Sequence, residues 1–274
     1  MSIQTPVKNI HVHGNKIRYL DYNSFSSKKS ETLVLLHGIG ASAERWSNVI
    51  PFFYEHFRLI VPDIIGFGYS DKPTVEYNVP FFVKFLVEFL NCLGTKKISI
   101  AGSSLGGLIA AEFAIKYSHM VNKLILVSPA GTTKTSTKTL EEYILASLYP
   151  THDNVWRAFN NMAFDPRTVK EQTIEEFINR MKLPNAKYAF MSTMLAIRNT
   201  TDLSSRLSKI LSPTMIMWGE QDDMIPVKYA EDYRNIPNSN LEVIPQCGHT
   251  PFTEKPAVFS KKAIDFLIGF NSIK

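Results

Sequence analysis

The chain has 274 residues, 45% of them hydrophobic, and a formal net charge of +5. This size and composition allow a large core, and α/β folds commonly reach this length as one domain, so one domain with an insertion is expected. The basic residues are spread along the chain rather than gathered in a run, which argues against a nucleic-acid partner. Cys92 and Cys247 fall in different predicted elements, and no disulfide framework is indicated.

The first residues, Met-Ser-Ile-Gln-Thr-Pro, do not resemble a signal peptide, and no apolar run has the length of a membrane span. We therefore expect a cytoplasmic protein without a membrane partner, as a monomer or homodimer. His11 and His13 share one face of a predicted strand, but no set of Cys, Asp or Glu accompanies them. Neither a metal nor another cofactor is expected.

Strands and helices alternate through most of the chain. Two short strands around Gly14-Asn15 predict an opening hairpin. The apolar runs that follow do not alternate with polar residues, which is typical of parallel strands covered on both faces, and amphipathic helices separate them. We expect strands at 32–36, 57–61, 98–101, 123–127, 214–218 and 241–244, and helices at 44–55, 79–93, 105–117, 227–235 and 256–270.

The alternation stops between residues 131 and 212. This segment has helical stretches at 140–149, 155–162, 169–180 and 187–199 and no convincing strand. We expect residues 1–130 and 213–274 to form the core domain and 131–212 to form a helical lid. Some apolar side chains of the lid should face a substrate pocket, for which Trp156, Met191 and Met194 are candidates. The others are Tyr143, Leu148, Phe159, Met162, Phe164, Met181 and Phe190.

The stretch from Ile98 to Gly107 joins a buried strand to a helix, with one serine at the bend. Its Gly102-Ser103-Ser104-Leu105-Gly106 sequence is typical of the strand-turn-helix geometry of a nucleophile elbow. Small residues are required beside the nucleophile because neighbouring backbones crowd it at this turn. Ser104 is the candidate nucleophile. The alternative is a plain turn in which Ser104 caps the helix.

A serine hydroxyl needs a base within reach and a carboxylate that orients the base. His249 is the candidate base, because it lies just after the last predicted strand in a loop bracketed by Gly and Pro. Asp222 follows the preceding strand and is the preferred acid. Asp223 and Glu220 are its local alternatives.

Cleavage also needs donors for the oxyanion that forms on the attacked carbonyl. One donor is the backbone N–H after the nucleophile, which belongs to Leu105 at the start of a helix. The second is expected from the loop after the strand at 32–36, where the Ile39 N–H is the candidate. Further candidates for the pocket wall are His37 and Ser103. We expect His37 to hold that loop rather than to act as a second base.

The chain carries five motifs that, in their order along the sequence, resemble those of α/β-hydrolase-fold esterases. The resemblance covers nearly the whole length of the chain. The resemblance implies a mostly parallel eight-stranded sheet flanked by helices, a helical lid after strand 6, and a Ser, Asp, His triad that needs no cofactor. Dehalogenases and epoxide hydrolases of this fold carry Asp at the elbow, so Ser104 excludes both. The motifs are His-Gly-Ile-Gly at 37–40, Asp63-x-x-Gly-Phe-Gly-x-Ser-Asp-Lys-Pro73, Gly-Ser-Ser104-Leu-Gly-Gly, Trp218-Gly-x-x-Asp222-x-x-x-Pro226 and Gly248-His249.

The nearest branch that the chain resembles is the carbon-carbon bond hydrolases of aromatic meta-cleavage products, through the segment at 198–207. Those enzymes usually carry Asn where this chain has Ser103 and Trp where it has Thr250, and both differences favour ordinary esters. We therefore expect a serine carboxylesterase that hydrolyses small to medium, largely apolar esters through an acyl-enzyme. The alternatives are a carbon-carbon bond hydrolase of meta-cleavage dienoates and a small-molecule receptor that retains the triad.

Overall fold

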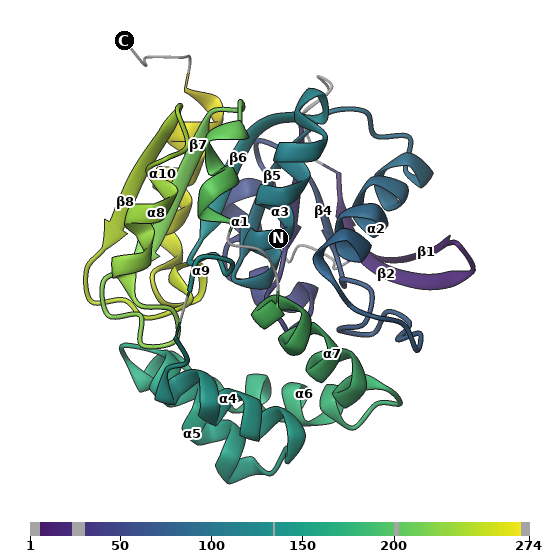
Figure 1. Cartoon of the computed structure of the whole chain (residues 1–274), viewed down its shortest axis with the longest axis vertical. Helices are drawn as coiled ribbons and strands as arrows, with labels where there is room; N and C mark the ends of the chain where they lie inside the picture. Colours follow the sequence, from purple (N-terminus) through teal and green to yellow (C-terminus); the bar gives the residue numbers. More distant parts are fainter. Residues whose placement is uncertain (1–5, 24–30, 134, 200–202, 270–274) are drawn as a thin grey trace.

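One eight-stranded sheet forms the centre of the protein (Figure 1). The computed structural model describes residues 6–23, 31–133, 135–199 and 203–269. The strands are β1 (Val7–Val12), β2 (Asn15–Tyr22), β3 (Thr32–Leu36), β4 (Arg58–Pro62), β5 (Ile98–Ser103), β6 (Val121–Val127), β7 (Thr214–Gly219) and β8 (Ser239–Ile244). Their order across the sheet is β1-β2-β4-β3-β5-β6-β7-β8. β2 is antiparallel to its two neighbours, and the other pairs are parallel, which confirms the predicted architecture.

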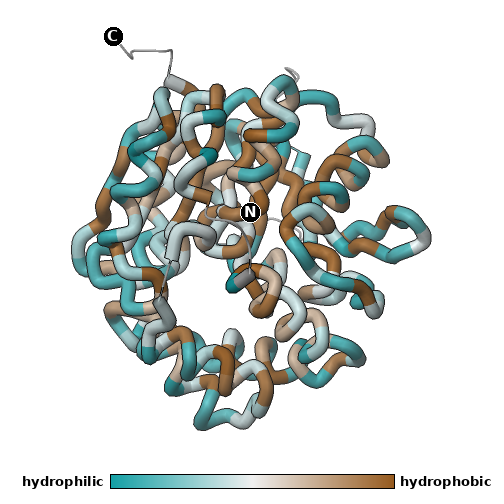
Figure 2. Tube along the Cα trace, viewed as in Figure 1, coloured by the Kyte–Doolittle hydropathy of each residue, from teal (hydrophilic) through white to brown (hydrophobic). Residues whose placement is uncertain are grey.

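Helices cover both faces of the sheet. α2, α3 and α8 belong to one hydrophobic core, and α1, α9 and α10 belong to a second core on the opposite face. Figure 2 shows hydrophobic residues along the central strands between these layers, as expected for parallel strands buried on both faces. The helices are α1 (Ile50–Phe53), α2 (Val79–Cys92), α3 (Leu105–Lys116), α8 (Ala230–Tyr233), α9 (Pro251–Glu254) and α10 (Pro256–Ile268).

Two predicted helices are broken in the structure. The helix predicted at 44–55 is a 3-10 turn, η1 (Ala43–Trp46), followed by the short α1. Pro51 lies in the first turn of α1, and because proline has no N–H it begins a helix more readily than it continues one. The helix predicted at 227–235 is likewise a 3-10 turn, η5 (Val227–Tyr229), followed by α8.

Four α-helices lie between β6 and β7 and are called the cap helices here: α4 (Lys138–Leu148), α5 (His152–Met162), α6 (Glu171–Met181) and α7 (Ala186–Asn199). They pack together at one end of the sheet (Figure 1). The described residues of this segment contain no strand. Its four helices agree with the sequence-based expectation within two or three residues at each end, and its role as a lid stays a prediction. No helix in the described part of the chain is long and apolar enough to cross a membrane.

The buried carboxylate of Asp63 fixes the loops beside β3 and β4. Its Oδ1 accepts the Ala43 N–H at 2.7 Å, and its Oδ2 accepts the Tyr69 N–H at 2.8 Å and an Arg18 guanidinium N–H at 3.0 Å. Gly68 passes so close that a Cβ there would lie 2.3 Å from the Asp63 carboxyl carbon. The Asp63-x-x-Gly-Phe-Gly motif therefore holds the loop that follows β3, where oxyanion donors are expected.

Candidate active site

Ser104 lies at a sharp turn between β5 and α3. Its backbone has φ 52° and ψ −115°, a conformation that side-chain-bearing residues rarely adopt and that costs about 1–3 kcal/mol. The turn is held by hydrogen bonds from Ser104 N–H to Val127 O (3.0 Å) and from Ala130 N–H to Ser104 O (3.0 Å). Ser104 does not cap α3 with its side chain. Its hydroxyl is thus free for another role.

Glycines allow this turn to form. A Cβ at Gly102 would lie 2.1 Å from Gly106 O, and a Cβ at Gly106 would lie 2.4 Å from Leu36 O. Both distances are far below van der Waals contact, so no other residue fits at either position. The crowding that the sequence pattern predicts around Ser104 is present in the structure.

Asp222 and His249 form a buried pair. The His249 Nδ1 is 2.8 Å from Asp222 Oδ2, and the two side chains are 4% and 0% exposed. The other oxygen of Asp222 accepts the N–H groups of Met224 (2.9 Å) and Ile225 (2.8 Å), which fixes the carboxylate on the loop after β7. Asp223 is exposed and has no such contact. With Nδ1 engaged, Nε2 is the nitrogen that remains available to a nucleophile.

The loop that carries His249 is anchored by one carboxylate. Glu254 accepts the Gly248 N–H at 3.0 Å, the Thr250 N–H at 3.2 Å and the Phe164 N–H at 2.9 Å. The first two amides flank His249, and the third lies just beyond α5. The His249 N–H itself donates to Met162 O of α5 at 3.0 Å. The end of a cap helix is therefore joined directly to the histidine loop.

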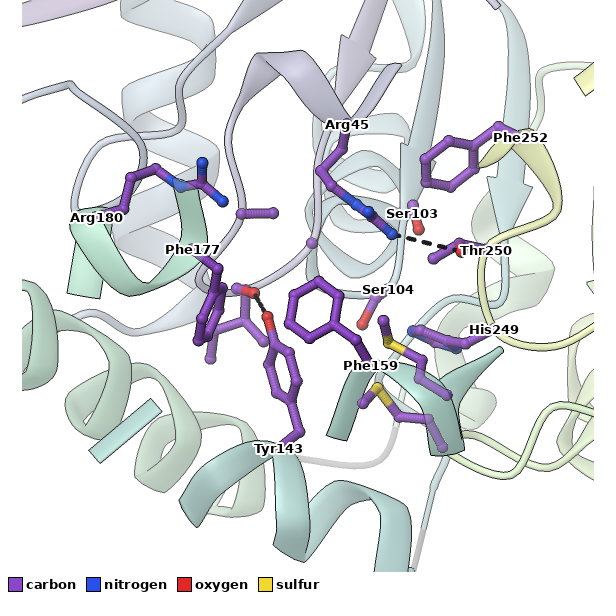
Figure 3. A pocket seen from close by; sticks show the side chains of 15 residues that line it. Arg45, Ser103, Ser104, Tyr143, Phe159, Phe177, Arg180, His249, Thr250 and Phe252 are labelled. Carbon is purple, nitrogen blue, oxygen red and sulfur yellow. Dashed lines mark hydrogen bonds between the residues drawn. The ribbon is translucent and has the colours of Figure 1, made fainter. Parts of the chain in front are cut away.

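The backbone amides of Ile39 and Leu105 fit the expected oxyanion donors. In the described parts of the chain, neither N–H donates to a protein acceptor. Ile39 lines the cavity that contains Ser104. The loop of Ile39 is held by Tyr143 of α4, whose hydroxyl donates to Ile39 O at 2.7 Å (Figure 3). Burial raises the pKa of Tyr143 to about 12, so it remains a donor at neutral pH.

Ser104 and His249 line the same small cavity of about 40 Å³ between the core and the cap helices. Figure 3 shows both side chains pointing into this space. Its volume corresponds to a few water molecules. The other lining residues are Gly38, Ile39, Ala41, Arg45, Ser103, Tyr143, Phe159, Met162, Phe177, Arg180, Met224, Thr250 and Phe252.

Two of these residues are cations: Arg45, which has no carboxylate within ion-pair distance among the described residues, and Arg180, which has one weakly placed partner. Arg45 comes from η1, and its nearest polar side-chain contact is Thr250 Oγ1 at 3.5 Å. Arg180 comes from α6, is 3% exposed, and approaches Glu176 no closer than 3.7 Å. The Arg180 Nε is buried without a hydrogen-bond partner. Charged groups are costly to bury unless they are paired, so two guanidinium groups in this cavity indicate a negatively charged ligand.

Four of the five predicted pocket residues do not line the cavity. His37 is fully buried behind it, where its Nε2 accepts the Ile64 N–H at 3.0 Å and its Nδ1 contacts Gly38 O at 2.7 Å. Burial lowers the pKa of His37, so it holds the loop as a neutral ring. Trp156 is 51% exposed.

Met191 and Met194 of α7 pack partly buried against the core and do not reach the cavity. The helical period explains why these two residues and Trp156 do not line the cavity as predicted, because neighbouring apolar residues of one amphipathic helix face different directions. Ser103 does line the cavity. So do three other apolar cap residues that the sequence suggested as a group, Tyr143, Phe159 and Met162.

The sequence-based reasoning missed Arg45 and Arg180. A signal for Arg180 existed, because it continues the buried face of α6 that includes Ile174 and Phe177, three residues apart. A charged residue at an apolar position of a helix marks a function or a buried ion pair. Arg45 had no comparable signal, since η1 was predicted as part of a longer amphipathic helix at 44–55.

Comparison with known proteins agrees with this geometry. Residues 31–256 match a family model described as the alpha/beta hydrolase fold. The chain is 28% identical over 266 residues to a 2-hydroxy-6-oxo-6-(2'-aminophenyl)hexa-2,4-dienoic acid hydrolase of Metapseudomonas resinovorans, covering 94% of this chain and 89% of the relative. It is 28% identical to a 2-hydroxy-6-oxo-6-phenylhexa-2,4-dienoate hydrolase of Burkholderia cepacia, covering 87% and 88% of the two chains.

The fold is also that of a solved meta-cleavage product hydrolase from Pseudomonas fluorescens. The two structures superpose with a TM-score of 0.84 at 24% sequence identity, over 95% of this chain and 97% of the other. The family match covers more than half of the sequence and includes the elements that carry Ser104, Asp222 and His249. The chain therefore belongs to the α/β-hydrolase fold family and is a hydrolase of that family.

Proposed function

We propose that this hydrolase uses Ser104, His249 and Asp222 to cleave substrates that carry a carboxylate, with meta-cleavage-type dienoates as its substrate class. The observation that carries the proposal is the presence of Arg180, a buried and incompletely paired cation, in the same cavity as Ser104 and His249. A carboxylate bound by a guanidinium gains two charge-assisted hydrogen bonds. The dienoate names of the similar enzymes supply the chemical class.

The chemistry follows from the arrangement of the triad. Ser104 Oγ adds to the ketone carbon at the scissile bond while His249 Nε2 takes the hydroxyl proton, and Asp222 holds the imidazole through Nδ1–H. The Ile39 and Leu105 amides bind the oxyanion that forms. Before this addition the dienoate must tautomerise: its 2-hydroxy group loses a proton and the carbon attached to the scissile ketone gains one, which gives a conjugated 2-keto enone. The carbon-carbon bond then breaks, its electron pair passes into this enone to form a dienolate, and the imidazolium returns a proton to the dienolate. Water hydrolyses the remaining acyl-enzyme and restores Ser104.

The two arginines argue against the largely apolar esters expected from the sequence. An apolar substrate would leave the Arg45 guanidinium without a counter-charge and the Arg180 guanidinium with only the Glu176 carboxylate at 3.7 Å, which is unfavourable for cations in a closed cavity. Esters that carry a free carboxylate form the second candidate class. Ser103 and Thr250, which differ from the usual residues of the carbon-carbon hydrolases, favour this class.

Three substrates separate these activities: a meta-cleavage dienoate, p-nitrophenyl hydrogen glutarate, and the neutral p-nitrophenyl butyrate. We expect the dienoate to give the highest kcat/KM and the neutral ester the lowest. Ser104→Ala should lower turnover of all three by at least about 10³-fold. Arg180→Met should raise KM and lower kcat/KM for the two acidic substrates by about 10- to 100-fold, because a charge-assisted contact is lost.

Arg157→Met is the matched control, since Arg157 lies exposed on α5 of the same cap. It should behave as the wild type does. Preference for the neutral ester, with no effect of Arg180→Met on any substrate, would refute the acidic substrate class. Absence of Ser104-dependent turnover, together with a large ligand-induced rise in Tm, would instead support the receptor alternative.

A further inference from the structure

A second small cavity, of about 10 Å³, adjoins the one that contains Ser104. The two cavities share Arg45, Phe159, Met162 and Thr250, so a single layer of side chains separates them. The second cavity extends between η1, the histidine loop and the segment that joins α5 to α6. It is therefore a side compartment of the candidate active site.

The walls of this compartment carry several hydroxyl groups. Thr168, Thr173, Thr250 and Thr253 contribute them. The Thr168 hydroxyl already donates to Asp165 O at 2.7 Å, so the other three are the candidate donors. The Thr253 Oγ1 is buried and has no hydrogen-bond partner. Buried polar atoms in native proteins are usually satisfied, so this hydroxyl is available to a polar group that enters the compartment.

Arg45 supplies the positive charge of the compartment. Its guanidinium lies over the Phe159 ring, 5.8 Å from the centroid, and no carboxylate in the described residues lies within ion-pair distance of it. The two carboxylates whose charge acts on Arg45 have other partners: Glu254 binds three backbone N–H groups, and Glu176 faces Arg180. Arg45 is thus a cation held between two cavities without a counter-ion.

We propose that Arg45 and the threonine hydroxyls around it form a second anion subsite, so that the preferred substrate carries two carboxylates, one bound by Arg180 and the other by Arg45. This inference rests on the proposed function for the role of Arg180. Figure 3 shows Arg45 extending toward Thr250 and Arg180 entering from the α6 side, so the two cations approach the cavity from different walls. A dicarboxylate can bridge them, whereas a monocarboxylate satisfies only one.

Binding can be measured without cleavage in the Ser104→Ala chain. The probes are linear dicarboxylates from malonate to suberate, each compared with the monocarboxylate of equal chain length, by thermal shift at equal concentration. We expect the dicarboxylates to raise Tm more, with a maximum at the length that spans the two guanidinium groups. Adding Arg45→Met should abolish the difference between the paired probes, and adding the control Arg157→Met should preserve it.

Cleavage gives the second arm of the experiment. In the wild type, kcat/KM for a dienoate with a terminal carboxylate should exceed that for its methyl-terminated analogue by about 10- to 100-fold, the value of one charge-assisted contact. Arg45→Met should reduce this ratio toward one. An unchanged ratio and an unchanged thermal-shift difference in Arg45→Met would overturn the proposal.

The arms also separate this inference from the proposed function. Ser104-dependent cleavage that needs Arg180 but shows no dicarboxylate preference would refute the Arg45 subsite and leave the proposed function standing. Arg45-dependent binding of dicarboxylates without any cleavage of dienoates would support the Arg45 subsite and refute the proposed function. A fall in the ligand-free Tm of Arg45→Met well below that of Arg157→Met would show that Arg45 serves the fold, and would also overturn the subsite.

Discussion

Replacing Glu254 tests how the loop that carries His249 is held. Its carboxylate accepts three backbone N–H groups, those of Gly248, Thr250 and Phe164, at 2.9–3.2 Å. Glu254→Ala leaves all three without this acceptor. The residue is 9% exposed, so water can replace only part of what is lost.

The size of the effect follows from these bonds. A hydrogen bond to a charged group contributes about 1.5–3 kcal/mol, and partial rescue by water reduces the sum of three, so we expect a loss of about 2–5 kcal/mol in the free energy of unfolding. For a chain of this size that corresponds to a fall in Tm of roughly 4–20 °C. Glu254→Gln should lose less, because its one carbonyl oxygen can still accept the two N–H groups that share Oε2.

The same change should slow the reaction. Gly248 and Thr250 flank His249, so loss of their common acceptor lets the imidazole shift, and a displacement of about 1 Å can cost about 10²-fold in rate. We expect kcat of Glu254→Ala to fall by about 10- to 100-fold with a smaller change in KM. Steady-state kinetics and thermal unfolding measure both effects. Glu231→Ala, at an exposed carboxylate on α8, is the control. Equal Tm and kcat in Glu254→Ala and Glu231→Ala would refute the role of Glu254 in holding the histidine loop.

Two further predictions concern thiol reactivity and acid stability. Burial raises the pKa of the Cys247 thiol, whereas Cys92 is exposed. Iodoacetamide should therefore modify Cys92 alone in the native chain. Rapid modification of Cys247, detected by peptide mass spectrometry, would contradict this prediction. Burial by itself raises the pKa of Asp21, but hydrogen bonds and charges of Arg58 and Lys8 outweigh it and hold that pKa below its usual range. The stabilisation is present at neutral pH and is lost as the pH falls through the lowered pKa. Asp21→Asn should cost about 1–3 kcal/mol at pH 7 and progressively less below about pH 4, and a pH-independent cost in thermal unfolding would oppose the assignment.

Local and periodic features of the sequence determined the sheet, the elbow and the triad candidates. The apolar runs of β3, β5, β6 and β7 predict buried parallel strands because every residue of such a strand contacts a covering layer. The glycines around Ser104 predict the elbow because the close approach at 102 and 106 permits no Cβ. Asp222 and His249 follow successive strands, and parallel strands bring their carboxyl ends to one edge of the sheet.

Only the tertiary packing determined which residues form the wall of the cavity. Arg45, Arg180 and Thr250 are far apart in the sequence but line one cavity. Taken alone, the local sequence fits an amphipathic helix at Arg45 and at Arg180 and a loop at Thr250. The direction of a side chain on a cap helix depends on how that helix rotates against its neighbours, so Trp156 is exposed while Phe159, three residues later, lines the cavity. A local pattern specifies which face of an element is apolar, but only the packed chain determines which charges that face encloses.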